Sequence, residues 1–254
     1  MLEKFHTIKA IFFDLGYTLI YFSGDFNQTI MDSYLVMADS LINAGCQIDR
    51  TDFARKFDDK IKSYYHQREQ DFLERPVESI IKQILAESDQ DHFSNAVYLQ
   101  AMQAMYLVTE KYWLIEEDTH ETLQWLIDSG YKLGLISNAS NAWDVNNLVD
   151  MHNLRPYFST ILISASEGIR KPNPLLFQHA AQSLGVDLSE TIMVGDTLDA
   201  DVLGAHLAGI RAIWISRRKG SQRASDFSNP ILQPDAEIKT LRELPALLTN
   251  WNGK

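Results

Sequence analysis

The chain has 254 residues, 45% of them hydrophobic and 22% charged, a composition that is ordinary for a globular protein and excludes a disordered chain. This length predicts one or two domains with a sizeable core. The 34 acidic and 23 basic side chains give a net charge of −11, which argues against nucleic acid as a partner and predicts repulsion of an anionic substrate unless a metal or local donors reverse the field.

The first predicted element in chain order is a strand at residues 9–14, a continuous apolar run that ends in Asp14. The region from about 22 to 113 contains no convincing strand, and its apolar residues recur at helical spacing, as in Ile30, Tyr34 and Met37. Such spacing is typical of amphipathic helices that bury one face. We therefore predict a helical module inserted after the first strand.

Strands and helices alternate from about residue 115 onward. Further strands are predicted at 132–138, 160–164, 191–196, 211–216 and 236–238. Helices are predicted at 121–129, 174–184, 199–208 and 241–248. Because continuous apolar runs are typical of strands buried on both faces, the pattern predicts an α/β fold with a doubly wound parallel sheet. Residues 217–234 are predicted to form a loop.

Cys46 is the only cysteine, and the seven histidines form no spacing typical of a metal site. Disulfide frameworks and cysteine zinc sites are therefore excluded within one chain, and the histidine spacing argues against a histidine-built zinc site. A lone thiol without a visible secretory signal favours a reducing, cytoplasmic location. No apolar run approaches the ~18–20 residues of a membrane span, so we expect no membrane partner. We expect either a monomer or a homodimer.

Two of the predicted strands end in polar residues that suit phosphate chemistry. Asp14 follows the first strand, where a carboxylate can act as a nucleophile, a metal ligand or both, the structural alternative being a helix cap. Ser137 and Asn138 end the second core strand, where a hydroxyl, an amide and nearby backbone N–H groups can hold phosphate oxygens. A turn made of Ser and Asn is equally consistent with this second pair.

Two later segments supply charge. Lys171 lies in a segment pinned by two prolines, 170–174, and can neutralise a bound anion there, unless it is simply a solvated surface lysine. The segment 194–201 places Asp196, Asp199 and Asp201 directly after a predicted strand. Carboxylates this crowded repel one another unless a cation is present, and a few hard oxygen ligands suit Mg²⁺.

These four segments, in this order and with helices between the first two, resemble the haloacid dehalogenase-like (HAD) hydrolase superfamily, in its branch with a helical cap. The resemblance covers essentially the whole chain. It implies a Rossmann-like core domain at 1–21 and 114–254 and an all-helical cap domain at 22–113. The superfamily's phosphatases are magnesium-dependent hydrolases that form an aspartyl-phosphate.

The resemblance also implies which residues bind the metal and react. Asp14 matches the catalytic nucleophile, and it would also ligate Mg²⁺ beside the backbone carbonyl of Gly16. Asp196 matches the carboxylate that binds magnesium, and Asp201 matches the supporting acid near the metal.

Other matching residues would bind the substrate. Ser137 matches the hydroxyl that binds the transferred phosphoryl group, and Asn138 would add its backbone N–H. Lys171 matches the catalytic lysine that balances the charge of nucleophile and phosphate. Thr18 matches a threonine with a local structural role.

The first motif departs from the superfamily pattern at two positions. Gly16 stands where phosphatases of the superfamily carry a second Asp, and Tyr17 stands where Gly is usual. That second Asp protonates the leaving oxygen and then activates water, and such acid–base help is typically worth ~10²–10⁴-fold. The departure puts the rate of turnover in question, while the nucleophile and the metal site remain.

Three functions therefore stay open. The first is a magnesium-dependent phosphatase that acts on a small phosphorylated metabolite, in which a good leaving group compensates for Gly16. The second is a 2-haloacid dehalogenase, in which halide leaves without protonation, although such enzymes need no metal and the intact Gly195-Asp196 argues against it. The third is a non-catalytic or regulatory binding protein that keeps the scaffold.

The cap is expected to set substrate choice, because the core motifs are shared across chemistries. Its densest polar and aromatic cluster is Tyr64, Tyr65, His66 and Arg68. An arginine there could bind a second anionic group, although a solvated helix edge is the simpler interpretation, so no cap residue is predicted as a site. Arg170 lies nearer the predicted site, where it could also merely support Lys171.

Overall fold

The computed structural model describes residues 7–90, 92–218 and 229–252. Six parallel strands form one sheet in the order β5-β4-β1-β6-β7-β8. Their bounds are β1 Ala10–Phe13, β4 Lys132–Ser137, β5 Thr160–Ile163, β6 Thr191–Gly195, β7 Arg211–Ile215 and β8 Ala236–Ile238. The chain extends to one side of β1 through β4 and β5 and then to the other side through β6, β7 and β8. The predicted doubly wound parallel sheet is thus confirmed.

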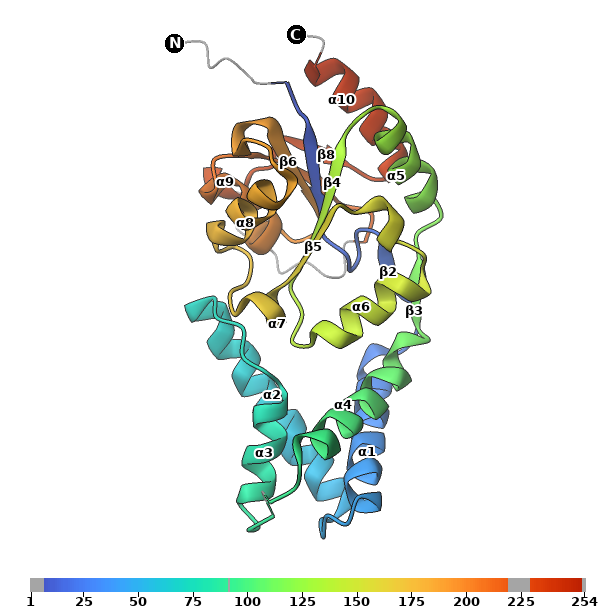
Figure 1. Ribbon diagram of the computed structural model, residues 1–254, viewed down its shortest axis with the longest axis vertical. Helices are drawn as coiled ribbons and strands as arrows, with labels where there is room; N and C mark the ends of the chain where they lie inside the picture. Colours follow the sequence, from blue (N-terminus) through green and yellow to red (C-terminus); the bar gives the residue numbers. More distant parts are fainter. Residues whose placement is uncertain (1–6, 91, 219–228, 253–254) are drawn as a thin grey trace.

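Helices cover both faces of this sheet (Figure 1). One face carries α5 Thr119–Asp128, α6 Ala142–Met151 and α10 Leu244–Asn252, and the other carries α8 Pro174–Leu184 and α9 Leu203–Leu207. Strand β1 shows why both faces must be covered, since Ile11 and Phe13 join one core cluster while Ala10 and Phe12 join the other. All four side chains are fully buried, as the continuous apolar run predicted.

The helical insertion is also confirmed. It consists of α1 Phe26–Asn43, α2 Arg50–Asp71, α3 Glu78–Ala86 and α4 Asn95–Glu110, which share a separate apolar core. Cys46 is buried in this core, as a small apolar residue would be. In Figure 1 the four helices lie below the carboxyl ends of the strands, so they face the edge of the sheet where ligands of such folds bind. We call these four helices and their connections the cap.

A small second sheet joins the cap to the core. Strand β2 Ile20–Phe22 pairs antiparallel with β3 Trp113–Ile115, at the two points where the chain enters and leaves the cap. The prediction of no strand from 22 onward to 113 was wrong at these two ends. Three-residue strands are too short to show a period of two, and their pairing brings together segments that are distant in sequence.

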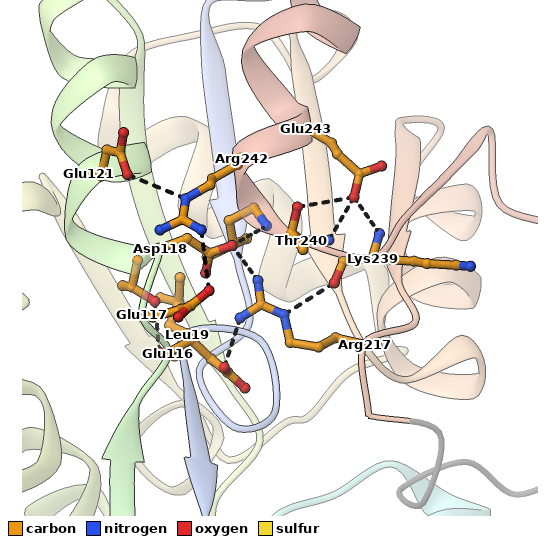
Figure 2. Close-up of polar contacts among 12 residues, drawn as sticks. Leu19, Glu116, Glu117, Asp118, Glu121, Arg217, Lys239, Thr240, Arg242 and Glu243 are labelled. Atoms are coloured by element: carbon orange, nitrogen blue, oxygen red, sulfur yellow. Dashed lines mark hydrogen bonds and ion pairs between the residues drawn. The ribbon is translucent and has the colours of Figure 1, made fainter.

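Buried ion pairs hold the segment after β3 against the core, as Figure 2 shows. Glu116 and Asp118 are 4% and 1% exposed. Arg217, which follows β7, donates hydrogen bonds to both carboxylates, and Arg218 donates to Glu116 at 2.5 Å. Because both acids are paired, their burial is compatible with a stable fold, and the connection between cap and core is anchored on its core side.

Three further differences from the sequence prediction concern local elements. Helices α6 and the short α7 Ser164–Glu167 were not predicted. The predicted helix at 199–208 begins as a π-helical turn, Leu198–Val202, before α9. Residues 219–228 of the predicted loop lie outside the described residues, and 230–232 form a 3-10 turn. Among the described residues, no helix combines the length and apolarity needed to cross a membrane.

Candidate active site

A cavity of about 370 Å³ opens at the carboxyl ends of β1, β4 and β6. The sheet reverses its winding direction beside β1, and such a switch point is where open α/β sheets bind their ligands. Every residue that the sequence singled out for catalysis or binding lines this cavity, namely Asp14, Gly16, Ser137, Asn138, Lys171, Asp196 and Asp201. The structure therefore brings together four motifs that are distant in the chain.

Three carboxylates form the acidic part of the site. One oxygen from each of Asp14, Asp196 and Asp201 lies within 4.8 Å of the other two. Asp201 is 1% exposed and accepts a hydrogen bond from the backbone N–H of Thr197 at 3.0 Å. A Cβ on Gly195 would lie 2.2 Å from Oδ2 of Asp201, so only glycine at 195 allows this carboxylate to approach the end of β6.

Lys171 lies among these carboxylates. Its Nζ is 2.7 Å from Oδ1 of Asp14 and 2.7 Å from Oδ1 of Asp201, and it donates a hydrogen bond to the carbonyl of Ile136 at 2.7 Å. The residue is 2% exposed, and burial opposes its charge. Asp14 and Asp201 outweigh that cost and hold the pKa of Lys171 above its usual value, so the ammonium stays charged.

Asp14, the candidate nucleophile, has a side chain that is 13% exposed and lies beside the ammonium of Lys171. Burial, with smaller contributions from Asp201 and Asp196, raises the pKa of Asp14 to about 7 against the opposing charge of Lys171. With all three carboxylates ionised, they and the ammonium leave a formal charge of −2. Hard oxygen donors with that excess charge fit a divalent cation such as Mg²⁺, which would also favour the ionised form of Asp14.

Ser137 and Asn138 lie on the same wall but differ in what they contact. The amide of Asn138 donates to the carbonyl of Lys171 at 2.9 Å and accepts from its backbone N–H at 2.8 Å. The side chain thus holds the lysine backbone in place, so only the main-chain N–H of Asn138 could serve as a phosphate donor. Ser137 ends β4, is 6% exposed and lines the cavity.

The rings of Tyr17 and Trp113 pack beside Gly16, the position at which the sequence departs from the family pattern. A Cβ on Gly16 would lie 3.6 Å from Cη2 of Trp113, which is ordinary van der Waals contact. Tyr17 adopts a positive φ of 57°, and its ring packs edge-on against Trp113 with centroids 5.5 Å apart. An acid at position 16 would therefore project against an indole. Sequence reasoning missed Trp113, because it lies at the far end of the cap.

A carboxyl pair across the boundary between cap and core was also missed. Asp144 of α6 lines the cavity and lies within hydrogen-bond reach of Glu110 of α4. Neither Oδ1 of Asp144 nor Oε1 of Glu110 meets a donor among the described residues, whereas Asn147 donates to the other oxygen of Glu110 at 2.6 Å. Two buried carboxyl oxygens facing each other are satisfied when the pair keeps one proton. The signal in the sequence was Asn141, whose side chain caps the backbone N–H of Asp144 and starts α6.

The protonated carboxyl pair predicts how stability depends on pH. Burial and the charge of Glu110 raise the pKa of Asp144 well above its usual value. The unfolded carboxyl releases its proton near pH 4 while the folded one keeps it, so this group loses stability as pH rises from about 4 toward the folded pKa. Asp144→Asn should therefore raise the free energy of unfolding by about 1 kcal/mol at pH 8, and by less at pH 5, in urea titrations.

Asp150→Asn is the matched control on the same helix. Asp150 is exposed, and its hydrogen bond with Arg155 lowers its pKa, so the sign reverses and the variant should be slightly less stable at pH 8. A gain for Asp144→Asn that is equal at pH 5 and pH 8 would contradict a retained proton.

Comparisons with known proteins agree with this geometry. A family model for haloacid dehalogenase-like hydrolases matches residues 8–209. Glyceraldehyde 3-phosphate phosphatase from Methanopyrus kandleri is 30% identical over 245 residues, covering 93% of this chain and 95% of that protein. Phosphoserine phosphatase from Thermus thermophilus is 40% identical over 115 residues, covering 45% of this chain and 43% of that protein.

A solved structure extends the likeness to the cap. The 2-haloacid dehalogenase from Pseudomonas syringae pv. Tomato DC3000 superposes with a TM-score of 0.67 at 25% identity, covering 96% of this chain and 99% of that one. The motifs gathered at the strand ends, the inserted helices and the family match over most of the length lead to one conclusion: the chain belongs to the haloacid dehalogenase-like hydrolase family.

Proposed function

We propose that this hydrolase is a Mg²⁺-dependent phosphatase that acts on a small phosphorylated metabolite through an aspartyl-phosphate on Asp14. The contact between Asp14 and Lys171 within the acidic cluster carries this proposal. It combines a carboxylate nucleophile, a fixed ammonium for the phosphate charge and a carboxylate set suited to a cation. Two relatives are named phosphatases of small phosphate esters, which supports the same substrate class.

The residues of the cavity would act in two steps. In the first, a carboxylate oxygen of Asp14 bonds to phosphorus as the bond to the leaving oxygen breaks, and the leaving oxygen takes a proton from solvent. Lys171, the hydroxyl of Ser137 and the backbone N–H of Asn138 would hold the phosphoryl oxygens through this transfer. In the second, water attacks the phosphorus, loses a proton to solvent and releases phosphate, which restores Asp14.

Magnesium, held by Asp14, Asp196 and Asp201 with the carbonyl of Gly16, would neutralise charge on the nucleophile and the phosphate. The protein itself supplies the positions of the reacting groups. Asn138 fixes Lys171 through its backbone. In Figure 1 the cap faces the carboxyl ends of the strands. Phosphoryl transfer depends mainly on such positioning and on charge stabilisation.

The acidic cluster also separates the proposed phosphatase from a dehalogenase. Displacement of halide from carbon requires no cation and no proton donor, so it gives no reason to keep three carboxylates within 4.8 Å of one another. The solved dehalogenase therefore supports the fold of this chain, while a carboxylate cluster suited to a metal ion favours phosphate chemistry.

The test is hydrolysis of p-nitrophenyl phosphate with and without Mg²⁺. We expect activity that is lost on chelation by EDTA and recovered when magnesium is added in excess. Activity that is indifferent to chelation would remove the metal from the proposal. Release of halide from 2-chloropropionate, without any phosphatase activity, would favour the dehalogenase, and no turnover of either compound would favour a non-catalytic protein.

Restoring the missing acid should increase turnover of poor leaving groups. In Gly16→Asp, the new carboxyl can protonate the leaving oxygen, so kcat for an alkyl phosphate such as glycerol 3-phosphate should rise about 10-fold or more. The rate with p-nitrophenyl phosphate should change less, because nitrophenolate needs little protonation. Trp113 lies 3.6 Å from the Cβ position, so the double variant Gly16→Asp/Trp113→Ala tests whether the indole limits the reach of the new carboxyl. Equal effects on both substrates would show that the acid is not limiting.

A further inference from the structure

A cluster of two arginines and one glutamate joins the cap to the core beside the cavity. Glu74 of the cap has a fully buried side chain. One of its oxygens accepts hydrogen bonds from Tyr64 at 2.5 Å and from Arg68 at 3.1 Å, and the other accepts from Ser164 at 2.9 Å. Arg170 of the core, directly before Lys171, places its Nε 3.6 Å from the second oxygen. We call Arg68, Glu74 and Arg170 the arginine cluster.

Backbone hydrogen bonds between cap and core hold this cluster next to Lys171, the proposed catalytic lysine. Residues Leu73 and Ile169 form an antiparallel bridge between cap and core. The N–H of Arg170 donates to the carbonyl of Phe72, and the N–H of Glu74 donates to the carbonyl of Gly168, each at 3.1 Å. Arg68 reaches the core as well, through a hydrogen bond of 2.7 Å to Ser140. Arg170 therefore has a fixed backbone at the wall of the cavity that holds Asp14.

The cluster carries more positive charge and more donors than Glu74 can satisfy. Two guanidinium groups face one buried carboxylate, and Glu69 adds only a weaker attraction from the exposed helix surface. Nε and Nη1 of Arg170 and Nε of Arg68 are buried and form no hydrogen bond among the described residues. Burial, with repulsion from Arg68, lowers the pKa of Arg170. The negative charge of Glu74 therefore does not fully compensate the positive charge of this guanidinium. Buried donors without acceptors are costly, and an anion would supply the missing acceptors.

We infer that Arg170, supported by Arg68, binds a second anionic group of the substrate, a carboxylate or a second phosphate carried by the leaving group. The inference rests on the proposed function, which places the reacting phosphate at Asp14 and Lys171. Arg170 lines the same cavity as that phosphate site. Lys171 lines it as well, so one small substrate can contact both residues. Planar guanidinium groups suit this task, because they bind carboxylates and phosphates through paired hydrogen bonds.

The rest of the cavity lining offers an anion no positive charge. Beyond the acidic cluster it includes Tyr17, Ile20, Trp113, Val145 and Leu148, together with the carboxyl of Asp144. Among the described residues that line this cavity, Arg170 and Lys171 are the only cationic side chains. The arginine cluster thus predicts the substrate class: small phosphate esters with a second anionic group, in preference to neutral phosphorylated alcohols.

The test uses three compounds on one three-carbon skeleton. Glycerol 3-phosphate has no second anion, 3-phosphoglycerate carries a carboxylate, and glycerol 1,3-bisphosphate carries a second phosphate. We expect kcat/KM for one or both of the doubly anionic compounds to exceed that for glycerol 3-phosphate by about 10- to 100-fold. Which of the two is preferred identifies the second group. Equal kcat/KM for all three compounds would overturn the inference, whereas p-nitrophenyl phosphate reports separately on the proposed phosphatase function.

Arg170→Met should reduce that preference about 10- to 100-fold, mainly through KM, and Arg68→Met should reduce it less. The measured quantity is the ratio of kcat/KM between doubly anionic and singly anionic compounds, so a general loss of activity does not affect it. Arg155→Met is the matched control, because Arg155 forms a surface ion pair with Asp150 outside the cavity, and its ratio should equal that of the wild type. Parallel losses for all compounds in Arg170→Met and Arg68→Met would assign both arginines a purely structural role and overturn the inference.

Binding provides a readout that does not require turnover. Titration calorimetry of Asp14→Asn with 3-phosphoglycerate and glycerol 3-phosphate, in the presence of Mg²⁺, should show the same preference in Kd. The preference should fall when Arg170→Met is added. If p-nitrophenyl phosphate is not hydrolysed, the proposed function fails, and these titrations still decide whether Arg170 selects a second anion.

Discussion

Replacing Asp14 by Asn should lower the Mg²⁺-dependent hydrolysis of p-nitrophenyl phosphate by about 10⁴-fold or more. The amide has nearly the shape of the carboxylate but cannot bond to phosphorus at neutral pH, so no aspartyl-phosphate can form. Lys171 and Ser137 would still bind phosphate, so KM for any residual activity should change little. Steady-state kinetics measure the loss, and intact-mass spectrometry of quenched reactions should show a phosphoryl adduct on the wild type alone.

Asp199→Asn is the matched control for this result. Asp199 belongs to the same acidic segment as Asp196 and Asp201, but it is exposed and does not line the cavity. Its activity should stay within about 2-fold of the wild type, as expected of a surface substitution. Wild-type rates in Asp14→Asn, with the fold verified by circular dichroism, would remove Asp14 as the nucleophile.

Lys171→Met should impair both catalysis and stability. Its Nζ lies 2.7 Å from an oxygen of Asp14 and 2.7 Å from an oxygen of Asp201, so its removal leaves crowded carboxylates without their cation. Breaking a buried ion pair by removing one partner typically costs ~3–5 kcal/mol. At pH 8 without magnesium we expect a loss of about 3 kcal/mol in urea unfolding, together with a fall of about 10²–10³-fold in kcat with Mg²⁺.

Magnesium should offset part of this loss. A divalent cation among Asp14, Asp196 and Asp201 replaces some of the missing positive charge, so adding Mg²⁺ should raise the Tm of Lys171→Met more than that of the wild type. Lys9→Met is the control, since Lys9 pairs with Glu190 at 2.6 Å on the surface and its loss should cost little. A Tm of Lys171→Met that does not respond to Mg²⁺ would count against a metal at these carboxylates.

The sheet could be predicted from the sequence because each core strand is a continuous apolar run. The strands predicted at 9–14 and 191–196 are only one or two residues longer than β1 and β6. The structure pairs these two strands side by side. The same residues fixed the location of Asp14 and Asp196, since a polar residue directly after a buried strand must lie at the edge of the sheet. Helical spacing likewise predicted the cap, whose four helices bury their apolar stripes together.

The elements that escaped prediction depend on contacts between distant segments. Helix α6 begins a few residues after β4, and the only local signal of its start is Asn141, whose side chain caps the N-terminus of the helix. Strands β2 and β3 exist because each pairs with the other, although the whole cap separates them in sequence. Neither local propensity nor periodicity records such pairing, which is a property of the folded chain.

The sequence by itself determined the fold class, the inserted cap and the residues that meet at the candidate active site, because burial patterns and the positions of polar residues at strand ends are local. Only the tertiary structure showed that Lys171 contacts Asp14 and Asp201, that Asn138 holds this lysine by its backbone, and that Trp113 stands where a second acid would project. It also changed the interpretation of Arg170, from a neighbour of Lys171 to part of a charged cluster with Glu74 of the cap. The physical reason is that electrostatic interactions act through space: the charge and the unmet donors of a side chain depend on what the fold places around it, and the chain order does not encode that.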